Sequence, residues 1–226
     1  MARGSDFGRG MKAALPIVLG YVPIGLAFGA LARQIGLSLW QIGLMSALVY
    51  AGSSQFIAVS LLGVGASLLT IVVTTFLVNL RHLLMSSALS PHLPGLSGRF
   101  LALLAFGVTD ETFALNITRL RSESLTRHDI LGVHLTSQSS WFLGSLLGGV
   151  VGTLIPPGSF GVDFALPAMF ICLIVLQVRH RLDVGVVVLA GGLALGLTVA
   201  FPGSHYVAIT AAVVAATIGV AVHDEG

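Results

Sequence analysis

Charged residues are scarce in this sequence. Asp, Glu, Lys and Arg make up 9% of its 226 residues, against about 25% in ordinary globular chains. Hydrophobic residues make up 55%, and the mean hydropathy is +0.98. A soluble protein cannot cover its surface with so few charges, so the composition indicates a chain embedded in lipid. Little length remains for a separate soluble catalytic or DNA-binding domain.

Cysteine is almost absent as well. Cys172 is the only one, which excludes a disulfide framework and a cysteine cluster for a metal ion. The spacing patterns of zinc, phosphate-loop and dinucleotide sites are also missing. A net charge of +2 is too small to favour a nucleic-acid partner. We therefore expect no metal, no cofactor and no nucleic acid, and we expect the lipid bilayer to surround the chain.

Long apolar stretches separated by short polar connections make up most of the chain. Because about 20 apolar residues cross the hydrocarbon once, the sequence predicts an all-α polytopic membrane protein with about eight transmembrane helices. We expect one membrane domain, 1–226, which consists of a cytoplasmic tail 1–12, three-helix units 13–98 and 99–183, and two terminal helices within 184–222. The expected spans are 13–32, 38–62, 66–88, 99–118, 130–155, 163–179, 184–201 and 205–222.

Lys and Arg orient these spans, because cytoplasmic connections are enriched in them. With the N-terminus inside, two of these residues, Arg33 and Arg99, fall on the outer side. An even number of spans leaves both termini in the cytoplasm. The connection at Gly63 is so short that a re-entrant pair is the alternative for the second and third spans. The residues expected on the inner side are Arg3, Arg9, Lys12, Arg119, Arg121, Arg127, Arg179 and Arg181.

A weak internal repeat relates the two three-helix units. Three spans per copy is an odd number, so the second copy would enter the membrane from the opposite face, as in many secondary transporters. The alternative is that Leu, Ala and Gly four-mers recur by chance in such a composition. The matches are Leu26–Gly29 with Leu104–Gly107, Ser60–Gly63 with Ser145–Gly148, and Asn79–His82 with Gln177–His180.

The third and fourth spans carry side chains that are costly in lipid. Asn79, Arg81 and His82 lie in the third span, and Asp110 and Glu111 lie near the middle of the fourth. We expect Arg81 to pair with Asp110 or Glu111, because antiparallel neighbours place them at similar depths. Such a pair either pins two helices together or belongs to a site for a zwitterionic or ionic solute. His82, Asp110 and Glu111 are the candidates for proton coupling, since burial shifts their titration.

Two spans contain polar segments between apolar flanks. Tyr50–Phe56 in the second span indicates either a helix break, whose free backbone groups bind a solute, or simple helix packing. Thr136–Trp141 in the fifth span has similar chemistry, and we expect the substrate path to pass between Tyr50–Phe56 and Ser137–Trp141. In the fifth span Gly144, Gly148 and Gly152 then follow at intervals of four, which predicts a close packing seam.

At these residues the chain resembles the AzlC family of branched-chain amino-acid exporters. The resemblance runs from about Pro16 to the end of the sixth span, and Ser54, where alanine is more usual, is a conservative departure. It implies export of leucine, isoleucine, valine and sometimes methionine, and a small four-helix partner of the AzlD type. The segments that carry it are Tyr50–Phe56, Asn79–Met85, Thr109–Phe113 and Gly161–Ala165.

A site for a branched-chain amino acid needs an apolar pocket, acceptors for the ammonium group and donors for the carboxylate. Asp110 or Glu111 would bind the ammonium group, while Arg81 or the amides after Ala51 would bind the carboxylate. The candidate substrate-binding residues are Tyr50, Gly52, Ser53, Ser54, Gln55, Phe56, Asn79, Arg81, Asp110, Glu111, Ser137, Gln138 and Trp141.

The expected function is therefore secondary transport across a bacterial inner membrane by alternating access, coupled to an ion or a proton. A passive channel would line a continuous pore with the same polar residues. An intramembrane hydrolase is the third alternative, although Gly52-Ser53-Ser54 lacks the second glycine of a nucleophile elbow.

Overall fold

The computed structural model describes residues 2–154 and 181–201, and scattered residues within 164–178 and 207–219. The chain divides into two compact units, Met1–Leu166 and Pro167–Gly226. Every regular element among the described residues is helical, as the sequence predicts. Asp163 and most of the predicted sixth and eighth spans lie outside the described residues. The division of the chain into three-helix units at 13–98 and 99–183 remains a prediction.

The described helix of the second unit is α10 (Arg181–Ala200), which corresponds to the predicted seventh span. It is long and apolar enough to cross a membrane, as are α2 (Leu15–Gln34) and the stretch Leu68–His92 in the first unit. An eight-span count is not confirmed, because these are the three helices among the described residues that meet both conditions.

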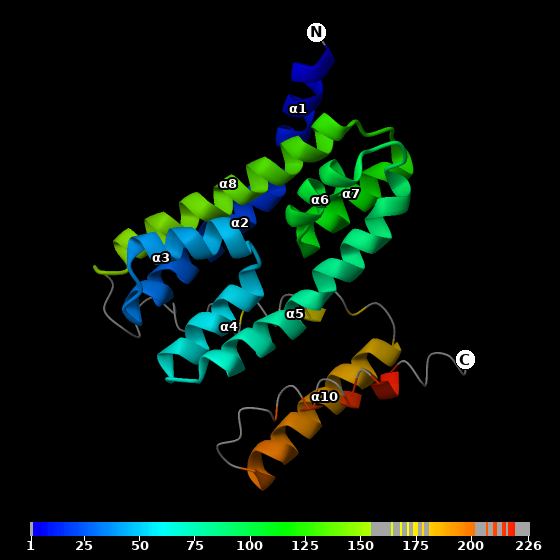
Figure 1. Ribbon diagram of the computed structural model, residues 1–226. Coiled ribbons are helices and arrows are strands. Elements are labelled where there is room, and N and C mark those ends of the chain that lie inside the picture. Colours follow the sequence, from blue (N-terminus) through cyan, green and yellow to red (C-terminus); the bar gives the residue numbers. More distant parts are fainter. Residues whose placement is uncertain are drawn as a thin grey trace. The chain divides into compact units, whose positions relative to one another are not determined.

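In the first unit, α2 and α8 (Arg127–Val151) lie side by side and run in the same direction (Figure 1). Glycines line their contact: a methyl group on Gly29 would clash with the carbonyl oxygen of Ser145, and one on Gly148 would clash with that of Leu26. Gly144 and Gly152 likewise face backbone atoms of α2. The predicted seam is confirmed, and small residues are its cause because they let two backbones touch.

The N-terminal residues, predicted as a cytoplasmic tail, form helix α1 (Ala2–Ala13), which packs on the start of α8. Arg9 holds the buried Asp129 with two hydrogen bonds, Nε to Oδ1 and Nη2 to Oδ2, each 2.7 Å long. The amide and hydroxyl of Thr126 also donate to Asp129 Oδ2, and in return Thr126 caps α8. This ion pair therefore joins α1 to the beginning of α8.

The contact with Arg9 lowers the pKa of the Asp129 carboxyl. Burial raises the pKa of the carboxyl, but the hydrogen bonds from Arg9 and Thr126 outweigh burial and lower it from 3.8 to about 2. Because the folded-state pKa lies below the ordinary value, the ion pair stabilises the fold fully above about pH 4. That stabilisation is lost as the pH falls from about 4 through 2.

Asp129→Asn is expected to lower the melting temperature of the protein in detergent at pH 7 by roughly 3–12 °C, the effect of losing a charge-assisted hydrogen bond at this chain length. It should also flatten the dependence of the melting temperature on pH between about 4 and 2. Asp6→Asn is the matched control, since Asp6 lies 3.6 Å from Arg9 in a single-turn contact on an exposed arginine. Equal losses in both variants would contradict this assignment.

The predicted second span is broken into two half-helices. α3 (Leu39–Leu44) continues as the π-helix η1 (Met45–Val49), and after Tyr50 and Ala51 the chain starts again as α4 (Gly52–Gly63). Each half covers about 11–12 residues, or roughly 17 Å, which is half of the hydrocarbon thickness. A methyl group on Gly63 would lie 3.2 Å from Ile35, so the two ends of this segment lie together.

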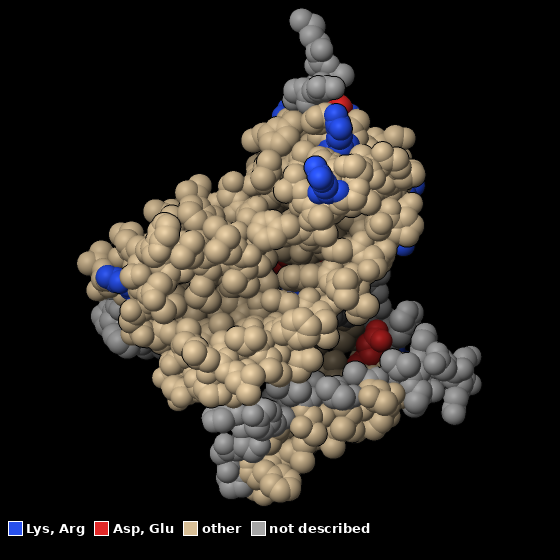
Figure 2. All heavy atoms as spheres, viewed as in Figure 1, with Lys and Arg blue, Asp and Glu red and all other residues tan. Residues whose placement is uncertain are grey.

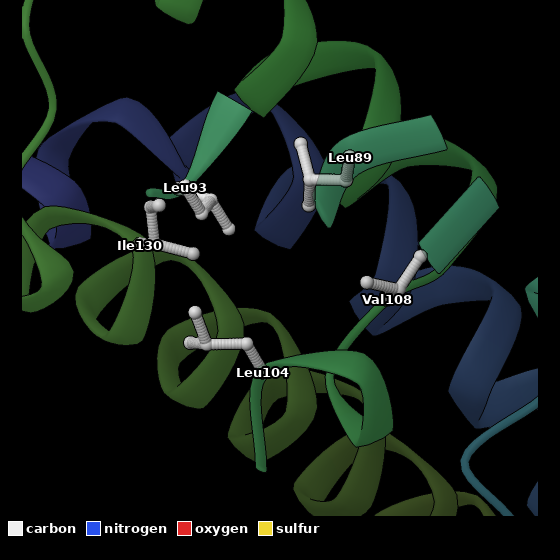
Figure 3. Close-up of a cluster of buried hydrophobic side chains, with 5 residues drawn as sticks. All are labelled: Leu89, Leu93, Leu104, Val108 and Ile130. Atoms are coloured by element: carbon white, nitrogen blue, oxygen red, sulfur yellow. The ribbon is translucent and has the colours of Figure 1, made fainter. Parts of the chain in front are cut away.

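The predicted fourth span is broken in the same way. After α5 (Leu68–Leu89) and the 3-10 turn η2 (Ser90–His92), α6 (Gly98–Phe106) and α7 (Asp110–Ser122) form a second hairpin. The residues just before and just after this hairpin pack against a buried cluster that includes Ile130 at the start of α8. Figure 3 shows the five buried side chains of this cluster. The cluster consists of Leu89, Leu93, Leu104, Val108 and Ile130, with Leu96 and Leu125 packed against it.

These contacts give α5 the direction opposite to the one predicted. It begins close to α4, and its last turn lies near Ile130, at the same end of the unit as the Arg9–Asp129 pair. The connection that contains Arg99 therefore lies on the same side of the unit as α1 and the end of α7. The sequence had predicted it on the side opposite to the N-terminus. Lys and Arg side chains gather around that end in Figure 2, whereas the wide face over α2, α3 and α4 shows almost none. Both hairpins thus resemble re-entrant segments.

Labelling of introduced cysteines distinguishes the two topologies. In a Cys172→Ser background, Lys12→Cys and His92→Cys are expected to react from the same side of the membrane and Val64→Cys from the other, because each hairpin returns to its own side. Eight complete spans predict the reverse grouping, with residues 12 and 64 together. That grouping would show the hairpins to be full crossings.

Candidate functional site

The break in the second span lies at Tyr50 and Ala51. Tyr50 adopts a left-handed backbone conformation, φ 42°, which is strained for a residue other than glycine. Its side chain is buried, and its hydroxyl has no hydrogen-bond partner among the described residues. α4 then begins at Gly52 without a side-chain cap. The predicted helix break is therefore present, and it leaves an uncapped helix N-terminus inside the unit.

The second break, at Gly107–Thr109, ends in a capped and acidic helix start. Thr109 caps α7 and exchanges hydrogen bonds with Thr112, and Asp110 and Glu111 occupy the first turn. Carboxylates are favourable there because a helix N-terminus carries a partial positive charge. The sequence had predicted Asp110 and Glu111 near the middle of a span. They lie instead in the first turn of a helix.

Arg81 of α5 connects the two breaks. Its guanidinium donates to the hydroxyl of Ser53 at 2.5 Å and pairs with Asp110, Nη1 to Oδ2, at 3.0 Å. The predicted pairing of Arg81 with one of the two acids is confirmed, with Asp110 as the partner. Both side chains are 27% exposed, so the pair lies in a partly open space. Since Ser53 begins α4 and Asp110 begins α7, the two helix N-termini converge on one arginine.

Glu111 is bound by a neutral group. The hydroxyl of Tyr21, on α2, donates to Glu111 Oε2 at 2.6 Å and lies 2.7 Å from Thr109 Oγ1. A phenol has a single proton to donate, so the Thr109 hydroxyl is the donor in the second contact. No ion pair joins Glu111 to Lys or Arg within residues 2–154. The junction therefore holds two carboxylates and one arginine.

Gln55 belongs to the packed core. Its side chain is fully buried, and its Oε1 accepts from Trp141 Nε1 at 3.0 Å and from the Ala51 amide at 3.3 Å. Its amide nitrogen lies 3.4 Å from the Ser46 hydroxyl. The sequence placed Gln55 on the substrate, but its hydrogen-bonding groups are used to join α4 to α8. A leucine at this position would therefore disturb the fold first.

Phe56 and Trp141 are packed in the same way. Phe28 stacks on Trp141 with 5.8 Å between ring centres and meets Phe56 edge to face at 5.5 Å. Tyr21 meets the edge of Trp141 at 5.6 Å. This aromatic cluster joins α2, α4 and α8, and it is connected to the junction through Tyr21, which also donates to Glu111.

The two polar segments of the second and fifth spans meet, as predicted. Gln138 Nε2 donates to the Ala47 carbonyl of the π-helix at 3.2 Å, and Trp141 Nε1 donates to Gln55 Oε1 at 3.0 Å. Within the first segment, Ser54 Oγ donates to the Ala51 carbonyl at 3.0 Å. A cavity of about 350 Å3 lies beside the first contact. Ser137 is fully buried, and its hydroxyl has no partner among the described residues. The cavity is lined by Ala47, Gln138, Ser139, Phe142 and Leu143.

Asn79 and His82 lie on α5 on either side of Arg81. The Asn79 Oδ1 and His82 Nε2 atoms are buried without a hydrogen-bond partner among the described residues. Neither contacts the acids through a hydrogen bond, so their roles in binding and coupling stay predictions. No group of three His, Cys, Asp or Glu side chains that could hold a metal ion occurs in the described part of the chain.

Three residues of this region were missed by the sequence analysis. Tyr21 donates to Glu111, and Thr109 bonds to Tyr21. His134 is buried, and its Nε2 lies 3.0 Å from Asn116 Nδ2. The pattern Gly107-Val108-Thr109-Asp110-Glu111 carried a detectable signal, a glycine followed by a Thr cap and two acids. Tyr21 had no local signal, because its partner lies 90 residues away.

Comparison with known proteins identifies the family of this chain. A family model described as AzlC protein matches residues 16–155. The chain belongs to the AzlC family. It is 32% identical over 201 residues to the inner membrane protein YgaZ of Escherichia coli (strain K12), covering 86% of this chain and 82% of that protein. It is 26% identical over 194 residues to the branched-chain amino acid transport protein AzlC of Bacillus subtilis (strain 168), covering 85% and 76%. No solved structure matches the chain.

The resemblance found in the sequence is thereby confirmed, and the AzlC family is a family of membrane transport proteins. The matched residues 16–155 contain α2, both hairpins, α5 and α8. Every residue of the junction around Arg81 lies within this matched region, so the site belongs to the part of the chain that defines the family.

Proposed function

We propose that this AzlC-family protein is a secondary transporter that exports branched-chain amino acids across a bacterial inner membrane. The proposed substrates are leucine, isoleucine and valine, with methionine as a further candidate. The observation that carries the proposal is the junction of two broken helices at Arg81, with opposite chemistry at the two helix starts. One start is uncapped and adjoins the arginine, whereas the other bears two carboxylates.

The carboxylate of a zwitterion binds at the start of α4. Free amides at an uncapped N-terminus and the local dipole favour an anion, and Arg81 and Ser53 lie beside them. The unpartnered hydroxyl of Tyr50 supplies a further donor at the break. Binding there replaces the contact of Arg81 with Asp110 by one with the substrate carboxylate.

The ammonium group binds at the start of α7. The acceptors are Asp110, once Arg81 turns to the substrate, and Glu111, which accepts from Tyr21 and forms no ion pair with Lys or Arg within residues 2–154. Charge balance favours a cation at this point, because two acids face one arginine. The proposed coupling mode is exchange of an ion or a proton for substrate, with the carboxylates at this helix start as the candidate carriers.

The proposal includes a small four-helix membrane partner of the AzlD type, as the resemblance implies, and both termini in the cytoplasm. The exposed apolar face of α5, which includes Leu69, Phe76, Leu83 and Leu84, is consistent with lipid or another membrane helix as its neighbour.

Counterflow of labelled leucine in liposomes tests the function. Vesicles preloaded with unlabelled leucine should accumulate the label transiently, with and without the partner compared side by side, because a carrier exchanges substrate across the membrane. Alanine-loaded vesicles are the control for side-chain selectivity. A channel would equilibrate the label without overshoot, and absence of any flux with the partner present would contradict a transporter for these amino acids.

A further inference from the structure

A second cavity lies away from the junction, between the last turn of α5 and α6. Its volume is about 460 Å3, within the range of about 300–1,000 Å3 found for small-molecule sites. It lies at the end of the unit that carries α1, because Leu93 and Leu104 in its wall also pack on Ile130 at the start of α8. Residues of the last turn of α5 line one side of it, and Leu104 and Ala105 of α6 line the other.

The lining has two chemical faces. Ser86, Ser87 and Ser90 place three hydroxyl groups at the C-terminal end of α5, where free carbonyls carry partial negative charge. The opposite face is formed by Leu89, Leu93, Leu104 and Val108, whose side chains converge in Figure 3. The polar face suits an ammonium group and the apolar face suits a branched aliphatic side chain.

The cavity also adjoins the central site. Ser86 and Ser87 follow Arg81 by five and six residues, which is about 8–9 Å along the helix. On the other side Val108 directly precedes Thr109, and the next residue, Asp110, pairs with Arg81. Val108 is 2% exposed and lines the cavity, so a buried side chain of the cavity wall lies next to Thr109 in the chain.

We propose that this cavity is a second binding station for an aliphatic amino acid, through which the substrate passes between the α1 side of the membrane and Arg81. Val108 is the partition between the two stations. The inference rests on the proposed function for the identity of the substrate, but binding at the cavity has its own measurement.

Protection of a cysteine in the cavity is that measurement. In a Cys172→Ser background, leucine should slow the alkylation of the Ser87→Cys variant about tenfold at ten times its dissociation constant, because only the empty cavity reacts. Val64→Cys, at the other end of the unit, is the control and should react at the same rate with and without leucine. Protection should persist when Arg81→Met and Asp110→Asn are added, since these changes remove only the central site.

Filling the cavity gives the second readout. Ala105→Phe should raise the leucine concentration for half-maximal counterflow at least about tenfold, the effect of about 1.4 kcal/mol. Leu103→Phe, on the neighbouring exposed face of α6, should leave it unchanged. Unprotected Ser87→Cys, or an unchanged half-maximal concentration in a folded Ala105→Phe protein, overturns the second station while leaving the transporter proposal intact. Protection without any leucine flux in the unmodified protein retains the station and rejects the proposed transport.

Discussion

Leucine counterflow is expected to fall at least about 100-fold in the double variant Arg81→Met/Asp110→Asn, although the protein should remain folded. Hydrogen bonds to charged groups are worth about 1.5–3 kcal/mol each, and the proposed site loses one for the carboxylate and one for the ammonium group. Folding should survive because both charges of the pair are removed together, which leaves no uncompensated charge inside the unit.

The single variants separate this role from a purely structural one. Arg81→Met or Asp110→Asn alone breaks the pair observed at 3.0 Å, so each should lower the melting temperature more than the double variant does. Arg33→Met is the matched control, since Arg33 bonds the Leu37 carbonyl at the end of α2. If the double variant regains both stability and transport, the pair only pins α5 to α7 and the substrate binds elsewhere.

Gly29→Ala is expected to prevent stable assembly of the first unit. The added methyl group would clash with the backbone carbonyl of Ser145, which no rotation of a side chain can relieve. α2 and α8 must then separate along their contact, at a cost of about 1–3 kcal/mol or more. We expect most of the protein to be lost as aggregate in size-exclusion chromatography after solubilisation.

Gly20→Ala is the control on the same helix, because a methyl group there meets nothing within 4 Å. It should keep or raise the melting temperature, since alanine is favoured over glycine in a helix by about 0.5–1 kcal/mol. If Gly29→Ala behaves like Gly20→Ala, the two backbones do not touch and the seam is wrongly placed.

The sequence predicted those features of the site whose causes are local. Gly52 to Gln55 are small and polar, so the break before α4 was recognised, and the intervals of four from Gly144 predicted the seam. The cost of a charge in lipid predicted the Arg81 pair. The break before Thr109 was missed because the apolar run on both sides has the length of a full span.

Features that depend on distant residues were beyond local patterns. Gln55 looked like a ligand because its partner from another helix, the indole of Trp141, lies 86 residues away in the chain. The direction of α5 was predicted from Arg and Lys counts, which assumed that every apolar stretch crosses completely. Two stretches fold back instead. After each of them, the chain continues from the side of the unit opposite to the one that a complete crossing would give.

The order of the partners along the chain has a consequence for biosynthesis. Asp110 and Glu111 leave the ribosome after Arg81 and Tyr21, and Asp129 leaves it after Arg9, so each acid meets a partner that has already been made. The hairpin of α6 and α7 can therefore enter the membrane with its charge neutralised. The hairpin of α3 and α4 follows the opposite schedule, because Gln55 obtains the indole of Trp141 only when α8 is synthesised. In chains that end before α8, the Gln55 side chain therefore still lacks the indole that joins α4 to α8.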